Sequence, residues 1–469
     1  MVRQIGISDY GLYALIGAFL SYFLIDFGLG SSIARFIAKF RAEGNENKIN
    51  NMLGVTTRIY LILDVVIFLL IAIVYFFISN IFTELTSSEI DKLKVVYLIA
   101  GFFSIASFLF TPVDGALIAY ERFFVLKLSE LLHKLLVIVF MVIALLNGQG
   151  LFALIFINGI IGFGIKLYKF FYIKKQANLK INLKFFDRIM AKELLSFSSW
   201  MFIIGISQRL LLNIIPTILG IFSGSTQIAI FAIAMTIEGY VWTFAYALNG
   251  LFLPKVTRLV SGHQNRQEVT NLMIRVGRLQ LFVIGLLITG VVVLGKSFIQ
   301  LWMGVDFILS YYVVLFLVVP GIITLSQEIA STLLFVENEI KYRAILFVFA
   351  SVLSVIIGIV LSPQYGALGP AIGVGIALIL CHVVGMNIVY SKVLKLEIGR
   401  FFKSVHLKMV WPLLVSSSLS VLGQQYFQID SWFSFLISSS AFVTVYIFLI
   451  WNLVMNKEEK KLALSLVNK

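Results

Sequence analysis

The stretch of sequence that decides the fold is residues 9–58, DYGLYALIGAFLSYFLIDFGLGSSIARFIAKFRAEGNENKINNMLGVTTR. It predicts an apolar helix with an acidic residue at mid-depth, then a basic polar loop, then the start of a second apolar helix. The same design returns over residues 228–278. The matching pairs are Tyr13 and Phe231, Arg35 and Lys255, Asn45 and Asn265, Asn51 and Asn271, and Arg58 and Arg278. Repetition on this scale predicts a duplicated bundle of membrane-spanning helices.

Four further pairs share one common spacing: Leu117 and Leu333, Glu121 and Glu337, Gly150 and Gly366, and Gly159 and Gly375. We expect Glu121 and Glu337 to lie in turns, where they brace neighbouring helices. Asp114, Glu130 and Glu328 lie near the same turns, and we expect them to form pairs at helix interfaces. Glycines in spans favour close approach of helices in lipid.

The composition is typical of a polytopic membrane protein. Hydrophobic residues make up 60% of the chain and charged residues 13%, whereas a soluble domain carries about 25% charged residues. The apolar runs have the length of roughly 20 residues that crosses a bilayer core as a helix. They do not alternate every second residue as barrel strands do. The expected fold class is therefore an all-α polytopic membrane protein.

The net charge of +14 does not indicate a nucleic-acid partner. The Lys and Arg residues concentrate in alternate loops between spans, which is the signature of a cytoplasmic face. The single cysteine, Cys381, lies within a span, so no disulfide framework and no cysteine metal site is expected. We expect no cofactor.

We expect thirteen spans, at about 10–33, 53–79, 93–118, 125–147, 150–172, 194–221, 226–252, 274–298, 309–335, 343–361, 367–391, 407–424 and 432–455. The alternation of basic loops places the C-terminus in the cytoplasm. In the second copy a full span precedes the repeated segment, but in the first copy only MVRQIGIS does. We therefore expect an intact design of fourteen spans, in groups of six, six and two.

The repeats define the expected domains. An even number of spans in each repeat leaves both copies in the same orientation, so the two bundles are parallel repeats. We expect an N-terminal bundle at 1–172, a cytoplasmic linker at 173–193, a C-terminal bundle at 194–393, and a helix pair with a cytoplasmic tail at 394–469. The linker mixes Lys with Leu, Ile and Phe at helical spacing, which predicts an amphipathic helix on the inner leaflet.

Ionisable side chains inside spans are expensive, so each of them is a candidate functional residue. The deepest predicted positions are those of Asp26, Asp64, Arg209 and Glu238. Lys166 and His382 occupy equivalent positions of the two repeats. Arg58 and Arg278 lie nearer the cytoplasmic ends of their spans.

Arg209 is the strongest single candidate for substrate binding. It lies in mid-span beside Gln208, with Asn213 one turn further on, where reaching either membrane surface would be strained. A buried guanidinium suits planar, bidentate recognition of phosphate. The alternative interpretation is a structural ion pair with Asp26 or Glu238.

No motif of a soluble enzyme is visible in the sequence. There is no Walker glycine loop, so no ATPase within this chain is expected to power transport. HExxH and GxSxG are absent, and no group of histidines and carboxylates has metal-ligand spacing.

The opening of the chain resembles the polysaccharide/O-antigen flippase family of the multidrug/oligosaccharidyl-lipid/polysaccharide exporter superfamily. That family shows an Arg-x-Leu-Gly…Tyr-Gly-x-Tyr stretch just after its first helix. Arg3, Ile5-Gly6 and Tyr10-Gly11-Leu12-Tyr13 fit this stretch, as does DFGLG at residues 26–30. The turn from Leu117 to Phe123 also fits. By its pattern of spans the resemblance covers essentially the whole chain.

The resemblance implies a MATE-like architecture and a flippase rather than an enzyme. The implied substrate is an undecaprenyl-diphosphate-linked oligosaccharide, moved across a bacterial or archaeal cytoplasmic membrane by alternating access. Arg209, assisted by Lys166, would hold the diphosphate, while Asp26 and Glu238 would set the charge of the cavity or bind a coupling H⁺ or Na⁺. The implied partners are membrane lipid and the polymerase and glycosyltransferases of a surface-polysaccharide pathway.

Three alternatives stay open. A multidrug or small-molecule antiporter of the same superfamily would typically have twelve spans, without the extra pair at 407–455. A membrane glycosyltransferase or polysaccharide ligase would carry larger exterior loops with catalytic acids or histidines. A major-facilitator transporter would usually show a Gly-x-x-x-Asp-x-x-Gly-Arg-Arg-type loop, which this sequence lacks.

Overall fold

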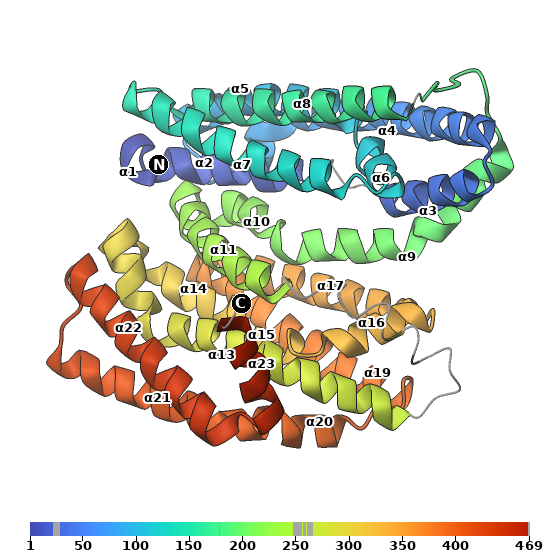
Figure 1. The fold of residues 1–469 in the computed structure, drawn as a ribbon. Coiled ribbons are helices and arrows are strands. Elements are labelled where there is room, and N and C mark those ends of the chain that lie inside the picture. The colour runs from blue at the N-terminus through green and yellow to red at the C-terminus, as the bar shows by residue number, and fades with distance from the viewer. Residues whose placement is uncertain (22–28, 178, 247–255, 257–258, 260–265, 468–469) are drawn as a thin grey trace. The chain divides into compact units, whose positions relative to one another are not determined.

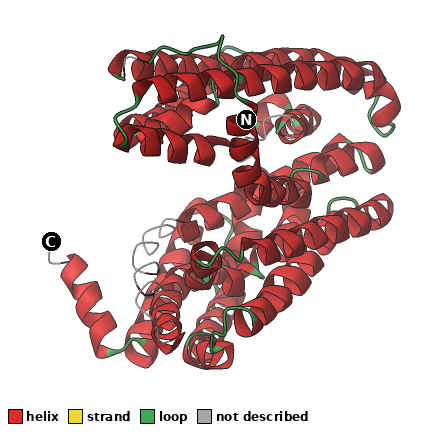
Figure 2. Ribbon diagram, turned by 90° about the vertical axis from the view of Figure 1, so that its right-hand side faces the viewer, coloured by secondary structure: helices red, strands yellow, loops and turns green. Residues whose placement is uncertain are grey.

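The computed structural model describes residues 1–21, 29–177, 179–246, 256, 259 and 266–467. Every regular element in these ranges is a helix (Figure 2). Twelve described segments are long and apolar enough to cross a membrane, and the shorter apolar helix Ile7–Leu20 comes in addition. The predicted all-α membrane fold is confirmed. The sequence predicts thirteen spans. The one that is not among the twelve is the first, 10–33, because residues 22–28 fall outside the described residues and only the shorter helix Ile7–Leu20 is described there.

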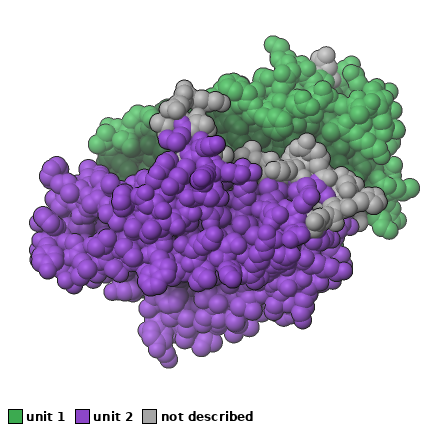
Figure 3. Space-filling view, turned by 60° about the horizontal axis from the view of Figure 1, so that its bottom comes forward, with its two compact units in different colours: residues 1–229 green, residues 230–469 purple. Residues whose placement is uncertain are grey.

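Contacts divide the chain into two compact units, residues 1–229 and residues 230–469 (Figure 3). The helices of unit 1 are α1 (Val2–Ile5), α2 (Ile7–Leu20), α3 (Leu29–Ala42), α4 (Glu46–Ile81), α5 (Ser87–Phe108), α6 (Pro112–Ala119), α7 (Phe123–Leu146), α8 (Leu151–Gln176), α9 (Arg188–Leu212) and α10 (Ile215–Phe222) (Figure 1). Helix α11 (Ser225–Tyr246) begins in unit 1 and continues into unit 2. The four-part division predicted from the repeat stays a prediction.

Unit 2 contains the second copy of the helix pattern. Its elements are α13 (Arg266–Met303), η1 (Val305–Phe307), α14 (Ile308–Val318), α15 (Gly321–Thr324), α16 (Glu328–Val336), α17 (Ile340–Tyr365), α18 (Leu368–Ala377), the π-helical segment η2 (Leu378–Gly385), α19 (Met386–Lys392), α20 (Ile398–Ser404), α21 (His406–Tyr426), α22 (Trp432–Leu449), the π-helical segment η3 (Ile450–Val454) and α23 (Lys457–Val467). The buried core of this unit joins α13 and α16 to α19–α22.

The predicted helix over the linker is wrong. Helix α8 continues to Gln176, and the next helix, α9, begins only at Arg188. The side chain of Asp187 accepts hydrogen bonds from the N–H groups of Ile189 and Met190, which fixes the start of α9. The linker between them is bound to α4 instead, through hydrogen bonds described with the site below.

Both units contain a spanning segment that is broken in the same place. In unit 1 the break separates α5 from α6, and Pro112 occupies the first position of α6. In unit 2 it separates α14 from α16, with Pro320 ahead of the short helix α15. Proline has no N–H to donate and therefore favours a fresh helix start over a continuous helix.

The turn after each broken helix is built alike in the two units. Glu121 and Asn338 occupy the left-handed position, with φ of 58° and 60°. Glu337 corresponds in the turn to Tyr120 rather than to Glu121, so the predicted match of Glu121 with Glu337 is displaced by one residue. Glu337 forms an ion pair with Arg266, which confirms that it braces a neighbouring helix.

A buried arginine attaches the C-terminal helix to unit 2. The Nε and Nη2 groups of Arg278 donate to the two carboxylate oxygens of Glu459 at 2.6 and 2.8 Å. Nη2 also donates to the carbonyl of Val454 at 2.8 Å, and Nη1 to that of Ser404 at 3.1 Å. The side chains of Arg278 and Glu459 are only 7% and 6% exposed. Such a bidentate pair is both strong and directional, so Arg278 holds α23 against α13.

This pair responds to pH in one direction. Burial disfavours the charged form of Glu459, but hydrogen bonds from Arg278 and from the N–H of Asn456 outweigh it and lower the pKa of this carboxyl. Because the pKa is lower in the folded state, the stabilisation is complete above the ordinary pKa of Glu. It is lost as the pH falls through the lowered value.

We expect Arg278→Ala to detach α23, because Glu459 would lose the partner of a buried charge. Removing one partner of such a pair destabilises by about 3–5 kcal/mol. Thermal unfolding of the purified protein measures the loss, and trypsin should then cleave at Lys457 or Lys460. Lys127→Ala, which removes an exposed pair with Glu130, should cost less than about 1 kcal/mol. A tail that stays protected in Arg278→Ala would contradict this role.

Candidate functional site

Arg209 lies on α9 in unit 1 and is half-buried. Its Nη1 group donates to the carbonyl of Ser21, at the end of α2. One turn further along α9, Asn213 donates from Nδ2 to the hydroxyl of Ser21 at 2.9 Å. Arg209 is thus held beside the point where α2 ends, and residues 22–28, which include the predicted site residue Asp26, lie outside the described residues.

Lys166 lies on α8, where it closes the break between α5 and α6. Its ammonium group donates to the carbonyl of Ser107 at 3.0 Å and to the hydroxyl of Thr111 at 3.5 Å. Ser107 belongs to the last turn of α5, whose carbonyls lack partners within the helix. One turn further along α8, Lys169 forms an ion pair with Asp114 of α6. The geometry of Lys166 is that of a helix cap, and its part in substrate binding stays a prediction.

Two more predicted residues lie on α4. The half-buried Asp64 has one carboxylate oxygen, Oδ1, that is buried without a hydrogen-bond partner. Arg58 lies two turns nearer the start of α4, with its guanidinium 5.8 Å from the centroid of the Phe186 ring. A cation over an aromatic face is a favourable contact, and here it attaches the linker to α4.

The remaining predicted residues belong to unit 2. Glu238 on α11 is 8% exposed, and no hydrogen bond or ion pair joins it to another residue in the described part of the chain. His382 in η2 is equally buried and stacks on Phe347 with ring centroids 4.1 Å apart. Its Nε2 has no hydrogen-bond partner. Arg278 is occupied by Glu459 as described above, and its predicted part in substrate binding stays a prediction.

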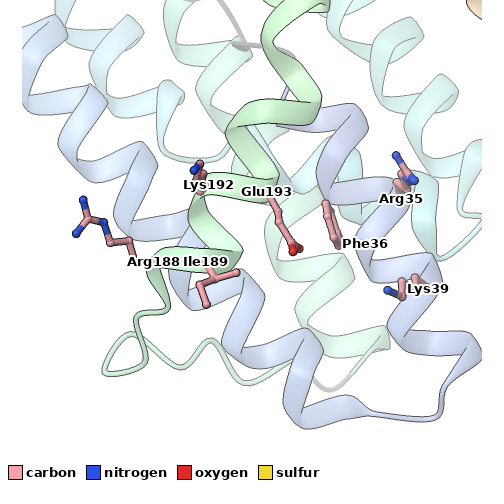
Figure 4. Close-up of a pocket in the computed structure, with 7 residues that line it drawn as sticks. All are labelled: Arg35, Phe36, Lys39, Arg188, Ile189, Lys192 and Glu193. Carbon is pink, nitrogen blue, oxygen red and sulfur yellow. The ribbon is translucent and has the colours of Figure 1, made fainter.

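A cationic pocket of about 800 Å³ lies between α3 and α9 in unit 1 (Figure 4). Its lining residues come from two short stretches, Arg35, Phe36 and Lys39 on α3 and Arg188, Ile189, Lys192 and Glu193 on α9. All four cationic side chains are exposed, and Glu193 is the one carboxylate among them. The volume lies within the range of small-molecule sites, roughly 300–1,000 Å³, and the excess of positive charge suits an anionic ligand.

The spacing of these cations supports a ligand-binding interpretation. Arg35 and Lys39 are four residues apart on α3, and so are Arg188 and Lys192 on α9. Residues four apart share one face of a helix, where like charges repel by a few tenths of a kcal/mol. Two such pairs line the same pocket, so both helices contribute clustered positive charge to it. We refer to this site as the cationic pocket.

The linker fixes the start of α9 and with it one wall of the cationic pocket. The backbone N–H of Lys180 donates to the Asn50 side chain at 2.9 Å, and the N–H of Asn182 donates to the carbonyl of Asn50 at 3.2 Å. The side chain of Asn182 donates to Oδ1 of Asn51 at 2.8 Å. Gly54 lets the linker lie against α4, because a Cβ there would overlap the carbonyl of Asn182.

A corresponding hydrogen bond, with a different donor, occurs in unit 2 and involves a repeated asparagine. Asn271 matches Asn51 in the repeat, and its Oδ1 accepts a hydrogen bond from Nη2 of Arg400 at 2.8 Å. Arg400, like Asn182, lies in the segment that follows the last helix of its repeat. In each copy an asparagine near the start of the second long helix therefore holds the segment that leaves the bundle.

Comparisons with known proteins agree with this fold. The family described as "Polysaccharide biosynthesis protein" matches residues 1–249. A structure of the lipid II flippase MurJ in an inward closed conformation is 16% identical, with a TM-score of 0.71, over 96% of this chain and 94% of that chain. An inward-facing multidrug resistance MATE family transporter of the MOP superfamily is 16% identical, with a TM-score of 0.67, over 83% of this chain and 94% of that one.

A third structure is an MOP superfamily transporter from Pyrococcus furiosus. It is 14% identical, with a TM-score of 0.55, over 82% of this chain and 90% of that chain. No curated protein matches the sequence. At these identities the solved structures establish the fold alone.

We expect Gly54→Ala to displace the linker, because the new methyl group would occupy the position of the Asn182 carbonyl. Overpacking of this kind costs about 1–3 kcal/mol, measurable as a lower thermal midpoint of the purified protein. Gly17→Ala is the matched control, since a Cβ there meets no atom within 4 Å. It should be neutral or stabilise by up to about 1 kcal/mol. Equal midpoints for the two variants would contradict the role of Gly54.

We expect the cationic pocket to bind inorganic pyrophosphate. Each Lys or Arg near an anionic surface contributes about 1 kcal/mol, so Lys39→Gln with Lys192→Gln should weaken binding by about tenfold or more. Titration calorimetry on the purified full chain measures this. Lys184→Gln, an exposed lysine outside the pocket, serves as the control and should leave the affinity unchanged. Loss of equal size in the control would assign binding to general surface charge.

Proposed function

The chain belongs to the polysaccharide biosynthesis protein family, and from this premise we propose that it translocates undecaprenyl-diphosphate-linked oligosaccharide repeat units. The product would serve surface-polysaccharide synthesis, such as that of O-antigen, capsule or a teichoic-acid-like polymer. The family and the fold support a multi-pass membrane flippase or transporter. The nature of the cargo, the cytoplasmic membrane as location, and a cytoplasmic C-terminus are part of our proposal.

The observation that carries the proposal is the half-buried Arg209, which lies in the last turn of α9 and within the candidate membrane span Phe202–Phe222. Ionisable groups in spans mark substrate pathways, and a planar guanidinium recognises phosphate oxygens two at a time. Asn213 adds a polar group one turn away. A diphosphate headgroup has the charge and the oxygen pattern that such a site binds, while the polyprenyl chain would stay in lipid.

The cationic pocket extends this interpretation. It offers a site of matching charge for the same headgroup, at the end of α9 opposite to Arg209. We infer that the pocket attracts the diphosphate and that Arg209 holds it during translocation. Lys166, Asp64, Arg58 and the unit 2 residues Glu238, His382 and Arg278 are the further predicted contributors. A coupling H⁺ or Na⁺ and the enzymes of the pathway are the proposed partners.

A multidrug or small-molecule antiporter of the same superfamily is the second candidate. The transporter fold alone does not separate the two, because a multidrug transporter matches as well. The lipid II flippase covers 96% of this chain against 83% for the multidrug transporter. This greater coverage favours a lipid-linked cargo. A membrane glycosyltransferase or ligase has no comparable support.

We expect Arg209→Ala to abolish export while the protein is still inserted, because the diphosphate would lose its charged partner. Arg209→Lys should rescue export only partly, since a lysine offers a point charge instead of a planar fork. A complementation assay for surface polysaccharide measures export, and immunoblotting of membranes measures insertion. Gln208→Ala, at the exposed neighbouring position, is the control. Full export by Arg209→Ala would remove this residue from the mechanism.

A further inference from the structure

The two broken spans can be compared with each other, because different charged side chains lie at the corresponding break in each unit. In unit 1 its charges are paired. Lys166 caps the end of α5, and Lys169, which is nearly buried, forms an ion pair with Asp114 of α6. Every charged group named at this break has a fixed partner, so the unit 1 break has the character of a structural joint.

The break in unit 2 is also polar, but its acid is left without an ion pair. Glu328 begins α16 directly after the break, and the hydroxyl of Thr332 donates to its Oε1 at 3.5 Å. No other hydrogen bond and no ion pair reaches Glu328 from the residues that the structure describes. The expectation that Glu328 forms an interface pair is therefore not met, although Asp114 does form one. A half-buried carboxylate with so weak a partner is poorly stabilised in its charged form.

Arg343 of α17 is close enough to act on the Glu328 carboxyl electrostatically, but no hydrogen bond or ion pair joins the two among the described residues. The Nη1 group of Arg343 donates instead to the hydroxyl of Ser331 on α16 at 2.6 Å. Its guanidinium lies 5.0 Å from the centroid of the Phe347 ring, and the other neighbour of that ring is His382 of η2. Arg343 is thus positioned between an unpaired acid and a buried histidine.

The backbone around this cluster is irregular. Gln327, the residue before α16, donates from Nε2 to Asn387 at 2.7 Å, and Asn387 donates to the carbonyl of Val383 at 2.7 Å within η2. Wide π-helical turns occur often at functional sites. Broken helices in transporters supply the binding sites of coupling ions. The polar groups therefore gather beside a helix break and a π-helical segment.

We propose that Glu328 binds and releases a proton during transport, with Arg343 as its counter-charge. When Glu328 is ionised it attracts Arg343 toward the break, and when it is protonated this attraction is lost and Arg343 keeps only its contacts with Ser331 and Phe347. The inference rests on the proposed transport function but not on the identity of the cargo. It supplies an energy source for a chain in which the sequence contains no Walker motif.

The charges of the site favour a proton over a metal ion. A metal cation at Glu328 would lie near the guanidinium of Arg343 and would be repelled by it. No group of three or more His, Cys, Asp or Glu side chains suited to a metal ion occurs among the described residues. The other titratable groups facing the cluster are His382 of η2 and Tyr390 of α19. Helix α13 presents apolar side chains to α16, and its Arg266 is occupied by Glu337.

The direct test follows the carboxyl by infrared difference spectroscopy during a pH titration of the full chain in liposomes. We expect the signal of protonated buried carboxyls to lose one component in Glu328→Gln and to keep that component in Asp114→Asn, while the buried Glu238 contributes a separate component in both variants. Arg343→Gln should move the midpoint of this titration to higher pH by at least about one unit, the size expected for a nearby opposite charge. A signal that is unchanged by Glu328→Gln would overturn the proposal.

A second measurement uses the same liposomes, loaded with a pH-sensitive dye and given a fluorescent undecaprenyl-diphosphate disaccharide as the probe. We expect proton movement with the wild type and with Asp114→Asn, and none with Glu328→Gln. If the probe crosses the bilayer without proton movement, the coupling role is overturned while the proposed function stands. If the probe does not cross but the carboxyl titrates as expected, the proposed function fails and the proton site stands.

Discussion

In a lipid bilayer each polar or charged group needs a partner within the protein, because no water is present to supply one. This requirement organises the whole chain. Helix formation satisfies most of the backbone, and the apolar surface of the helices faces lipid. The groups left over are the carbonyls at helix breaks, the linkers between bundles and the few charged side chains within spans. Their partners determine which residues are structural and which are available to a substrate.

In each copy of the duplicated bundle, corresponding residues supply partners for the polar groups that the helices leave unsatisfied. Asn51 and Asn271 hold the segments that leave the two bundles, and the turns at Glu121 and Asn338 have the same left-handed conformation. These repeated contacts form the scaffold. The two copies differ in how the charged side chains at the helix break are paired. The unit 1 break is closed by the Lys169–Asp114 pair, whereas the unit 2 break leaves Glu328 without one. The corresponding break is thus a paired joint in one unit and a differently charged site in the other.

The charged side chains of unit 1 lie in two different environments. The cationic pocket is open and carries exposed side chains on α3 and α9, whereas Arg209 is half-buried further along α9. A pocket of exposed charges attracts an anion at long range but loses strength in salt, since water and ions screen it. A guanidinium within a span is screened far less. The same helix therefore combines an exposed cationic pocket with a half-buried guanidinium.

The sequence alone determined the fold class, the number and place of nearly all spans, the duplication, and the small set of charged residues within spans. These properties follow from hydrophobic length and local spacing, which a linear pattern records directly. The tertiary structure decided which of these charged side chains already have a partner within the protein. Arg278 is bound by Glu459, which lies 181 positions further along the chain, and Lys166 closes a helix break. The linker lies along α4 instead of forming a helix. The pairs Arg35–Lys39 and Arg188–Lys192 were visible as spacings, but only the packing of α3 against α9 joins them into one pocket. Pairing between distant residues depends on how helices pack, and hydrophobic periodicity carries no record of it.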